Sequence, residues 1–229
     1  MFATNGSRRP SGDSAAREAM VRDQLQRRGI TDMRVLQAMR EIPRHLFVPP
    51  EWQHDAYSDR PLPIAEGQTI SQPYMVALML QSLSIPPNVR VLEVGTGSGY
   101  QAAVLSRLAA HVYTIEYFPA LAEQARTVLA QLHYTNIQVL VGDGSQGLAA
   151  HAPYDGIIVA AAAPHIPPSL LAQLRDRARL VIPVGALAGQ HLLIVTRQGT
   201  VYHTQRSVAC RFVPLLGQTG WSAEGPTPV

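Results

Sequence analysis

The 229-residue sequence predicts a doubly wound α/β fold with a mostly parallel sheet, an antiparallel C-terminal edge and N-terminal helices. Three observations carry this prediction. Short apolar runs alternate with helical segments from residue 74 to residue 184, as in a parallel sheet covered on both faces. One of these runs ends in alternating glycines that open a helix. After residue 190 the pattern changes to the two-residue period of a hairpin.

Two amphipathic helices are expected ahead of the sheet. The first covers residues 14–28 and should end at Gly29, while Asp32 can cap the second. Apolar side chains share one face of the second helix until Pro43 ends it, namely Val35, Leu36, Met39 and Ile42. The proline-rich stretch that follows, residues 43–73, is too long for a simple connection, and we interpret it as a binding loop.

The core elements should then alternate along the chain. Strands are expected at residues 90–94, 112–115, 137–141, 156–159 and 180–184, and helices at residues 74–83, 99–108, 119–132 and 168–174. The hairpin should pair residues 192–196 with residues 201–213 around the turn Gln198-Gly199, antiparallel at one edge of the sheet.

Composition limits the class of protein. Hydrophobic residues make up 46% and charged residues 15% of the chain, which is typical of a globular enzyme. The net charge is only +3 and the arginines are scattered, so nothing indicates a nucleic-acid partner. Cys210 is the only cysteine, which excludes an intramolecular disulfide or a cysteine-rich metal site. With no apolar run long enough to span a bilayer, we expect a cytoplasmic monomer without a metal or membrane partner.

A ligand site is predicted where the strand at residues 90–94 ends. Gly95, Gly97 and Gly99 alternate there with Thr96 and Ser98, and glycine lets the backbone turn sharply and approach a ligand. The next strand ends in Glu116, 21 residues after Gly95, where a carboxylate can accept both hydroxyls of a ribose.

Nicotinamide dehydrogenases share this combination, so the detailed pattern must separate the two classes. A pyrophosphate-binding turn reads Gly-x-Gly-x-x-Gly, whereas Tyr100 stands where its third glycine should be. Glu93 would repel a pyrophosphate but suits a ligand with a cationic amino-acid end, such as S-adenosyl-L-methionine. Asp143, between Gly142 and Gly144, ends the third strand and could accept from an adenine amino group. Three acids at successive strand ends match the outline of class I methyltransferases.

The loop before the first core strand narrows the prediction. Its segment Gly-Gln-Thr-Ile-Ser-Gln-Pro, residues 67–73, resembles the signature of the protein-L-isoaspartate O-methyltransferase family. Six further segments resemble the same family in order and spacing, so that the resemblance runs from about Val21 to Leu216: PRHLFVP at 43–49, EVGTGSGYQ at 93–101, GDG at 142–144, APYD at 152–155, LVIPVG at 180–185 and RFVPL at 211–215. The chain departs from the family at Ala160, usually threonine, at Arg177-Ala178, usually Gly-Gly, and at His133, often glycine.

This resemblance implies a Rossmann-like methyltransferase core and a specific reaction. A methyl group passes from S-adenosyl-L-methionine to the free α-carboxylate of an L-isoaspartyl residue, or less efficiently a D-aspartyl residue, in a damaged protein, leaving S-adenosyl-L-homocysteine. The ester then collapses to a succinimide, whose hydrolysis returns part of it to normal aspartate. A carboxylate is already ionised at pH 7, so the reaction needs alignment more than a general base.

The resemblance also implies roles for particular residues. Ser71 is the expected catalytic residue, because its hydroxyl would orient the substrate carboxylate. The expected cofactor-binding residues are Ile70, Gln72, Glu93, Gly95, Thr96, Gly97, Ser98, Gly99, Glu116, Asp143 and Gly144. The expected substrate-binding residues are Thr69, Ser71, Val213, Pro214 and Leu215, which would hold isoaspartyl-containing proteins and peptides through main-chain hydrogen bonds.

On this interpretation the chain divides into a flexible N-terminus at residues 1–13, one domain at residues 14–217 and a C-terminal tail at residues 218–229. Within the domain we expect N-terminal helices and substrate loop at 14–84, the cofactor-binding core at 85–185 and the hairpin at 186–217.

Three alternatives remain open. A methyltransferase for a small-molecule carboxylate would share most of these motifs. A nucleic-acid methyltransferase is disfavoured because residues 160–165 lack an Asn- or Asp-Pro-Pro-aromatic element and Cys210 is a poor nucleophile. A noncatalytic adenosine-binding module is disfavoured by the intact loop around Ser71.

Overall fold

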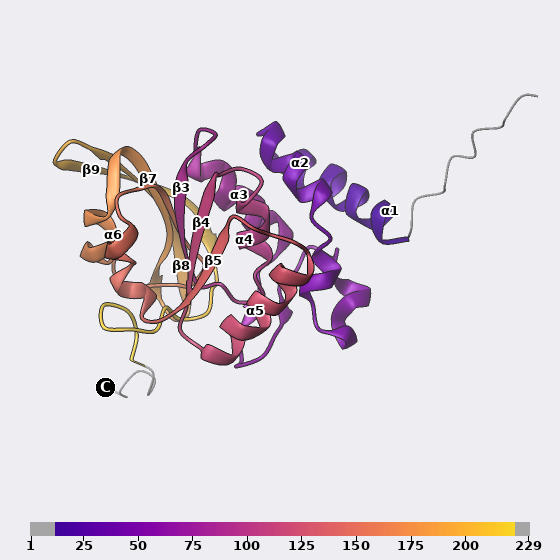
Figure 1. Cartoon of the computed structure of the whole chain (residues 1–229). Helices are drawn as coiled ribbons and strands as arrows, with labels where there is room; N and C mark the ends of the chain where they lie inside the picture. The colour runs from indigo at the N-terminus through magenta and orange to yellow at the C-terminus, as the bar shows by residue number, and fades with distance from the viewer. Residues whose placement is uncertain (1–11, 223–229) are drawn as a thin grey trace, which may run out of the picture.

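The computed structural model describes residues 12–222 and is built around a seven-stranded sheet (Figure 1). The strands are β3 (Arg90–Val94), β4 (His111–Glu116), β5 (Ile137–Val141), β6 (Tyr154–Val159), β7 (Leu174–Ala186), β8 (Gly189–Gln198) and β9 (Val201–Cys210). Their order is β5-β4-β3-β6-β7-β8-β9, with parallel pairing from β5 to β7 and antiparallel pairing from β7 to β9. The predicted doubly wound sheet with an antiparallel C-terminal edge is confirmed.

Helices cover both faces of this sheet. The helices are α3 (Pro73–Leu83), α4 (Tyr100–Leu105), α5 (Pro119–Gln131) and α6 (Pro168–Ala172). Side chains of β3 alternate between two hydrophobic clusters, with Val91 in the cluster of α3 and α4 and Leu92 in the cluster of α6. In Figure 1 the N-terminal helices lie beside α3 and α4, while α6 lies on the other side of the sheet. The chain adds β4 and β5 on one side of β3 and then returns to add β6 and β7 on its other side. The order of the strands therefore reverses between β3 and β6.

The predicted and observed strand bounds differ most at β7. Strands β3 and β5 have the predicted limits, whereas β7 begins at Leu174 and not at residue 180. An irregularity between Tyr154 and Gly156 lets β7 pair with β6 over this longer range. The helix expected at 99–108 is shorter, since α4 covers only Tyr100–Leu105.

The first N-terminal helix is not the single α-helix that we predicted. It consists of α1 (Gly12–Ala19), the π-helical segment η1 (Met20–Leu25) and the 3₁₀ segment η2 (Gln26–Arg28). The wider π turn places residues five apart above one another, so that both Met20 and Leu25 are buried in the core. Gly29 ends the segment in the left-handed conformation with φ 90°, as predicted.

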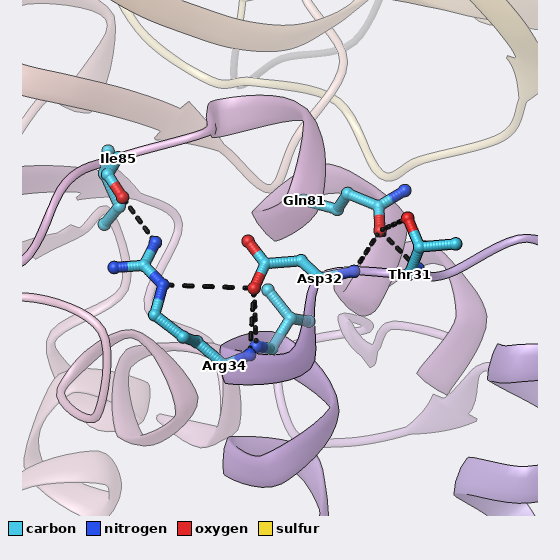
Figure 2. Close-up of polar contacts among 6 residues, drawn as sticks. Thr31, Asp32, Arg34, Gln81 and Ile85 are labelled. Carbon is cyan, nitrogen blue, oxygen red and sulfur yellow. Dashed lines mark hydrogen bonds and ion pairs between the residues drawn. The ribbon is translucent and has the colours of Figure 1, made fainter.

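The second helix, α2 (Met33–Glu41), begins at the predicted cap (Figure 2). Asp32 Oδ1 accepts hydrogen bonds from the backbone amides of Arg34 at 2.9 Å and Val35 at 3.4 Å. Gln81 of α3 accepts from the amides of Thr31 at 2.7 Å and Asp32 at 2.9 Å. Gln81 therefore links the start of α2 to α3.

The proline-rich stretch contains short elements of its own. These are the 3₁₀ helices η3 (Arg44–Phe47) and η4 (Pro50–Asp55) and a small antiparallel ribbon of β1 (Leu62–Pro63) and β2 (Thr69–Ile70). Within residues 12–222, no helix is both long and apolar enough to cross a membrane. Most of the N-terminus expected at 1–13, and the tail after residue 222, lie outside the described residues.

The backbone explains why glycine is usual in the family at two of the positions where this chain departs from it. His133 follows α5 with φ 60°, and Arg177 has φ 64°, both in the left-handed region that favours glycine. The glycines usual at these positions would adopt this conformation without the steric cost of a Cβ atom.

We expect His133→Gly to stabilise the protein by roughly 0.5–1 kcal/mol, because relief of left-handed strain exceeds the added entropy of the unfolded chain. Urea unfolding of the ligand-free protein would measure this change. His133→Ala keeps the strain and serves as the control, so equal stability of the Gly and Ala variants would contradict the explanation.

Candidate active site

A cavity lies at the carboxyl ends of β3, β4 and β6. It is lined by twelve of the predicted site residues: Thr69, Ile70, Ser71, Gly95, Thr96, Gly97, Ser98, Glu116, Gly144, Val213, Pro214 and Leu215. Four predicted residues, Gln72, Glu93, Gly99 and Asp143, lie outside its lining. Strand ends next to the reversal of a doubly wound sheet are the usual ligand position in such folds.

The glycine loop forms one wall of the cavity and is held by Glu116. Gly95, Gly97 and Gly99 have φ values of 90°, 52° and 84°, all in the left-handed region. The Glu116 carboxylate accepts from the Gly97 amide at 2.8 Å and from the Phe118 amide at 3.1 Å. A carboxylate has about four acceptor positions, so two bonds leave room for a ligand hydroxyl.

Glu93 lies behind the cavity wall and is completely buried. Its Oε2 accepts from the Thr114 hydroxyl at 2.6 Å, and that hydroxyl is 2.7 Å from the hydroxyl of Thr96, which lines the cavity. Its Oε1 makes no hydrogen bond of normal length and angle among residues 12–222, although the side chain of Gln101 is close enough to stabilise the carboxylate. Burial, with a smaller contribution from Glu116, raises the pKa of Glu93 to about 8, although hydrogen bonding from Thr114 and Gln101 opposes the shift.

Asp143 is engaged by the C-terminal segment. Its Oδ1 accepts from the Ser145 amide at 2.9 Å, capping η5 (Gly144–Gln146), and its Oδ2 accepts from the Gln218 amide at 2.7 Å. The amide of Thr219 in turn donates to the Ser145 hydroxyl at 3.1 Å. Residues 218 and 219, which we expected in a separate tail, thus contact the end of β5.

Ser71 lies where two hollows meet. Besides the cavity, it lines a second groove together with residues of the hairpin and α3, and the two hollows share Thr69, Ser71, Ala160 and Val213. Gln72, outside the cavity, lines this groove. The Ser71 hydroxyl has no hydrogen-bond partner among the described residues, so it is available to a ligand from either side.

The segment after β9 is anchored to the strand end of β6. Ala162 donates to the Val213 carbonyl at 2.8 Å, and Leu215 donates back to the Ala162 carbonyl at 2.8 Å. These bonds use the inner edge of residues 213–215. Val213 itself also faces the groove beside Ser71.

The sequence reasoning missed several residues that line the cavity. They are Gln68, Val76, Val94, Tyr100, Gln101, Ile115, Tyr117, Phe118, Ala160, Ala161 and Leu216. Most are direct neighbours of predicted residues, so extending each motif by one or two positions would have found them.

Comparison with known proteins identifies close relatives. A family model described as protein-L-isoaspartate(D-aspartate) O-methyltransferase matches residues 15–220. The chain is 54% identical over 212 residues to a protein-L-isoaspartate O-methyltransferase of Methanoregula boonei, covering 93% of this chain and 98% of that protein. It is 55% identical over 208 residues to one of Roseiflexus sp. strain RS-1, covering 91% and 95%. A solved protein-L-isoaspartate O-methyltransferase structure, 28% identical, matches 89% of this chain and 67% of that chain with a TM-score of 0.79.

Fold and cavity together define a methyltransferase with a Rossmann-like core. More particularly, the chain belongs to the protein-L-isoaspartate(D-aspartate) O-methyltransferase family. It transfers a methyl group to isoaspartyl residues of damaged proteins, as the motifs predicted. This membership decides against the dehydrogenase, nucleic-acid, small-molecule and noncatalytic alternatives.

The buried Glu93 carboxyl generates a prediction about pH. Its pKa is about 8 in the folded protein, against an ordinary value of 4.5, so between these limits the folded state binds more protons than the unfolded state. The free energy of unfolding should therefore fall as pH rises from about 5 to about 8. Glu93→Gln keeps the acceptor for Thr114 but cannot ionise, so it should lack this decline.

Thermal unfolding of both ligand-free proteins across this pH range measures the difference. The melting temperature of Glu93→Gln should rise relative to wild type with pH and then level off above pH 8. Parallel curves would show that Glu93 ionises normally in the folded protein.

Proposed function

We propose that the cavity binds S-adenosyl-L-methionine, that the adjoining groove binds the isoaspartyl segment of a protein, and that both meet at Ser71. The observation that carries this proposal is the set of residues common to both hollows, with Ser71 among them. Methyl transfer needs the nucleophile, the methyl carbon and the sulfur in line, and two hollows joined at one point favour that alignment.

The residues of the cavity fit this cofactor. Glu116 would accept the ribose hydroxyls with its remaining lone pairs, and the left-handed glycines allow close approach of the ligand to the backbone. Glu93 would act on the cationic amino-acid end through Thr114 and Thr96. A bound cation would favour the ionised carboxylate over the neutral form that the raised pKa of Glu93 gives the ligand-free protein. Asp143 remains our proposal for the adenine amino group, with lone pairs beyond the two that its amide donors use.

The bound cofactor supplies an electrophilic methyl group on a sulfonium. The enzyme's own contribution is to bind, orient and desolvate, because the substrate carboxylate is already ionised at neutral pH. Ser71 would donate its hydroxyl hydrogen to that carboxylate and hold it in line. Residues 213–215 would contact the main chain of the substrate, which suits a target that varies in sequence.

We also propose that the protein acts as a monomer in the cytoplasm, with residues 14–217 as one domain. A single cysteine without a disulfide partner supports a reducing compartment. The two hydrophobic clusters lie on opposite faces of one sheet, which supports a single domain.

Loss of the Glu116 carboxylate should weaken cofactor binding. Glu116→Ala removes a charged acceptor for the ribose, so the dissociation constant for S-adenosyl-L-homocysteine should rise by the equivalent of about 1.5–3 kcal/mol. Titration calorimetry measures this dissociation constant. The matched control is Glu123→Ala, which removes an exposed carboxylate on α5. An unchanged dissociation constant in a folded Glu116→Ala variant would show that Glu116 does not bind the cofactor.

Ser71→Ala should slow methylation while leaving affinity for S-adenosyl-L-homocysteine nearly intact. Loss of one hydrogen bond to a charged group corresponds to about 1.5–3 kcal/mol, or roughly one to two orders of magnitude in kcat/KM on an isoaspartyl peptide. The readout is methanol released at alkaline pH from the methyl ester, compared with the matched aspartyl peptide. If Ser71→Ala retained the wild-type kcat/KM, the Ser71 hydroxyl would have no role in orienting the substrate.

A further inference from the structure

Arg44 is a buried cation without an acidic partner. Its side chain is 0% exposed, and no carboxylate among residues 12–222 lies within ion-pair distance of it. Burial lowers its pKa to about 10, which leaves the guanidinium protonated at neutral pH. Arginine is rarely buried completely unless it is paired, so this position needs a reason beyond packing.

The guanidinium contacts the active-site loop. Its Nε donates to the Ala56 carbonyl at 2.8 Å, and its Nη2 donates to the Ser71 carbonyl at 2.8 Å. Its carbon Cζ lies 4.8 Å from the centre of the Tyr100 ring, and both Tyr100 and Ser71 line the cavity. The Tyr100 side chain also stabilises the charged guanidinium, whereas Nη1 makes no hydrogen bond of normal length and angle among the described residues. Asp59, a carboxylate whose charge raises the pKa of Arg44, is itself paired with Arg28.

The bond to Ser71 also affects the neighbouring amide. The carbonyl of Ser71 and the N–H of Gln72 belong to one trans peptide group, so they point in opposite directions. With its carbonyl directed at Arg44, this group turns its N–H away from Arg44, and that N–H has no hydrogen-bond partner in residues 12–222. A donor to the carbonyl polarises the whole group and strengthens its N–H as a donor.

We propose that Arg44 is a positioning residue for the substrate carboxylate, acting through the Ser71–Gln72 peptide group. It holds the Ser71 loop in place, and its charge favours an anion bound by the Ser71 hydroxyl and the Gln72 amide. This proposal rests on the function proposed above for Ser71. It explains why the protein keeps an unpaired cation in its interior: the counterion arrives with the substrate.

The test compares two peptides of identical sequence. One carries the isoaspartyl α-carboxylate, and the other carries a neutral carboxamide at the same position. Binding of each is measured by calorimetry to the enzyme saturated with S-adenosyl-L-homocysteine, for wild type, Arg44→Met and Arg44→Lys. Arg28→Met, which removes a partly exposed cation next to the same loop, is the matched control.

We expect wild type to prefer the carboxylate peptide, and Arg44→Met to reduce that preference at least tenfold while affinity for S-adenosyl-L-homocysteine changes less than threefold. Arg44→Lys keeps the charge but reaches only one carbonyl, so affinity for both peptides should fall together and the preference should persist. Arg28→Met should retain the wild-type preference.

Equal weakening of both peptides in Arg44→Met would make Arg44 a purely structural support and overturn the proposal. If Arg44→Met fails to bind S-adenosyl-L-homocysteine, the folded Arg44→Lys variant provides the test instead. Loss of its preference for the carboxylate peptide over the carboxamide peptide would overturn the proposal. A wild-type enzyme without any preference for the carboxylate would instead contradict the proposed function of the groove.

Discussion

The hydrogen bonds of the Glu116 carboxylate hold the active site together. One carboxylate at the end of β4 accepts from Gly97 in the glycine loop and from Phe118 at the start of α5. It therefore links the ends of two neighbouring strands and fixes the space between them. The glycines tolerate the left-handed backbone that this link requires. The position of the glycine loop relative to the start of α5 therefore depends on this carboxylate.

The arrangement suits a reaction in which the substrate brings its own nucleophile. No proton has to be removed from the substrate, so the roles that we propose are those of hydroxyl and amide donors and one buried cation, without a general base. Two buried titratable side chains lie behind the cavity walls. Glu93 lies behind the glycine loop and Arg44 behind the Ser71 loop.

The order of apolar, polar and glycine residues along the chain was enough to predict the sheet and most of the cavity. It does not show contacts between residues that are far apart in the sequence. Strands β3 and β5 were predicted to the residue because apolar runs and glycines mark their ends. The π-helical turn at Met20 could not be predicted, since packing of the folded protein selects it over an α-helix. Arg44 was missed for a similar reason, because its sequence neighbours give no sign that it is buried.

The departures from the family pattern show how such contacts decide the effect of a substitution. Ala160 donates its amide to the Val94 carbonyl at 2.8 Å and lines both hollows. Its Cβ would lie only 3.5 Å from a Cβ added at Gly95, so this side chain packs directly over the glycine loop. Alanine in place of threonine leaves the backbone bonds of the site unchanged and removes a hydroxyl at the junction. The side-chain hydroxyls that remain at this junction are those of Thr69 and Ser71, so the donors that it presents to a ligand depend on the position of their loop.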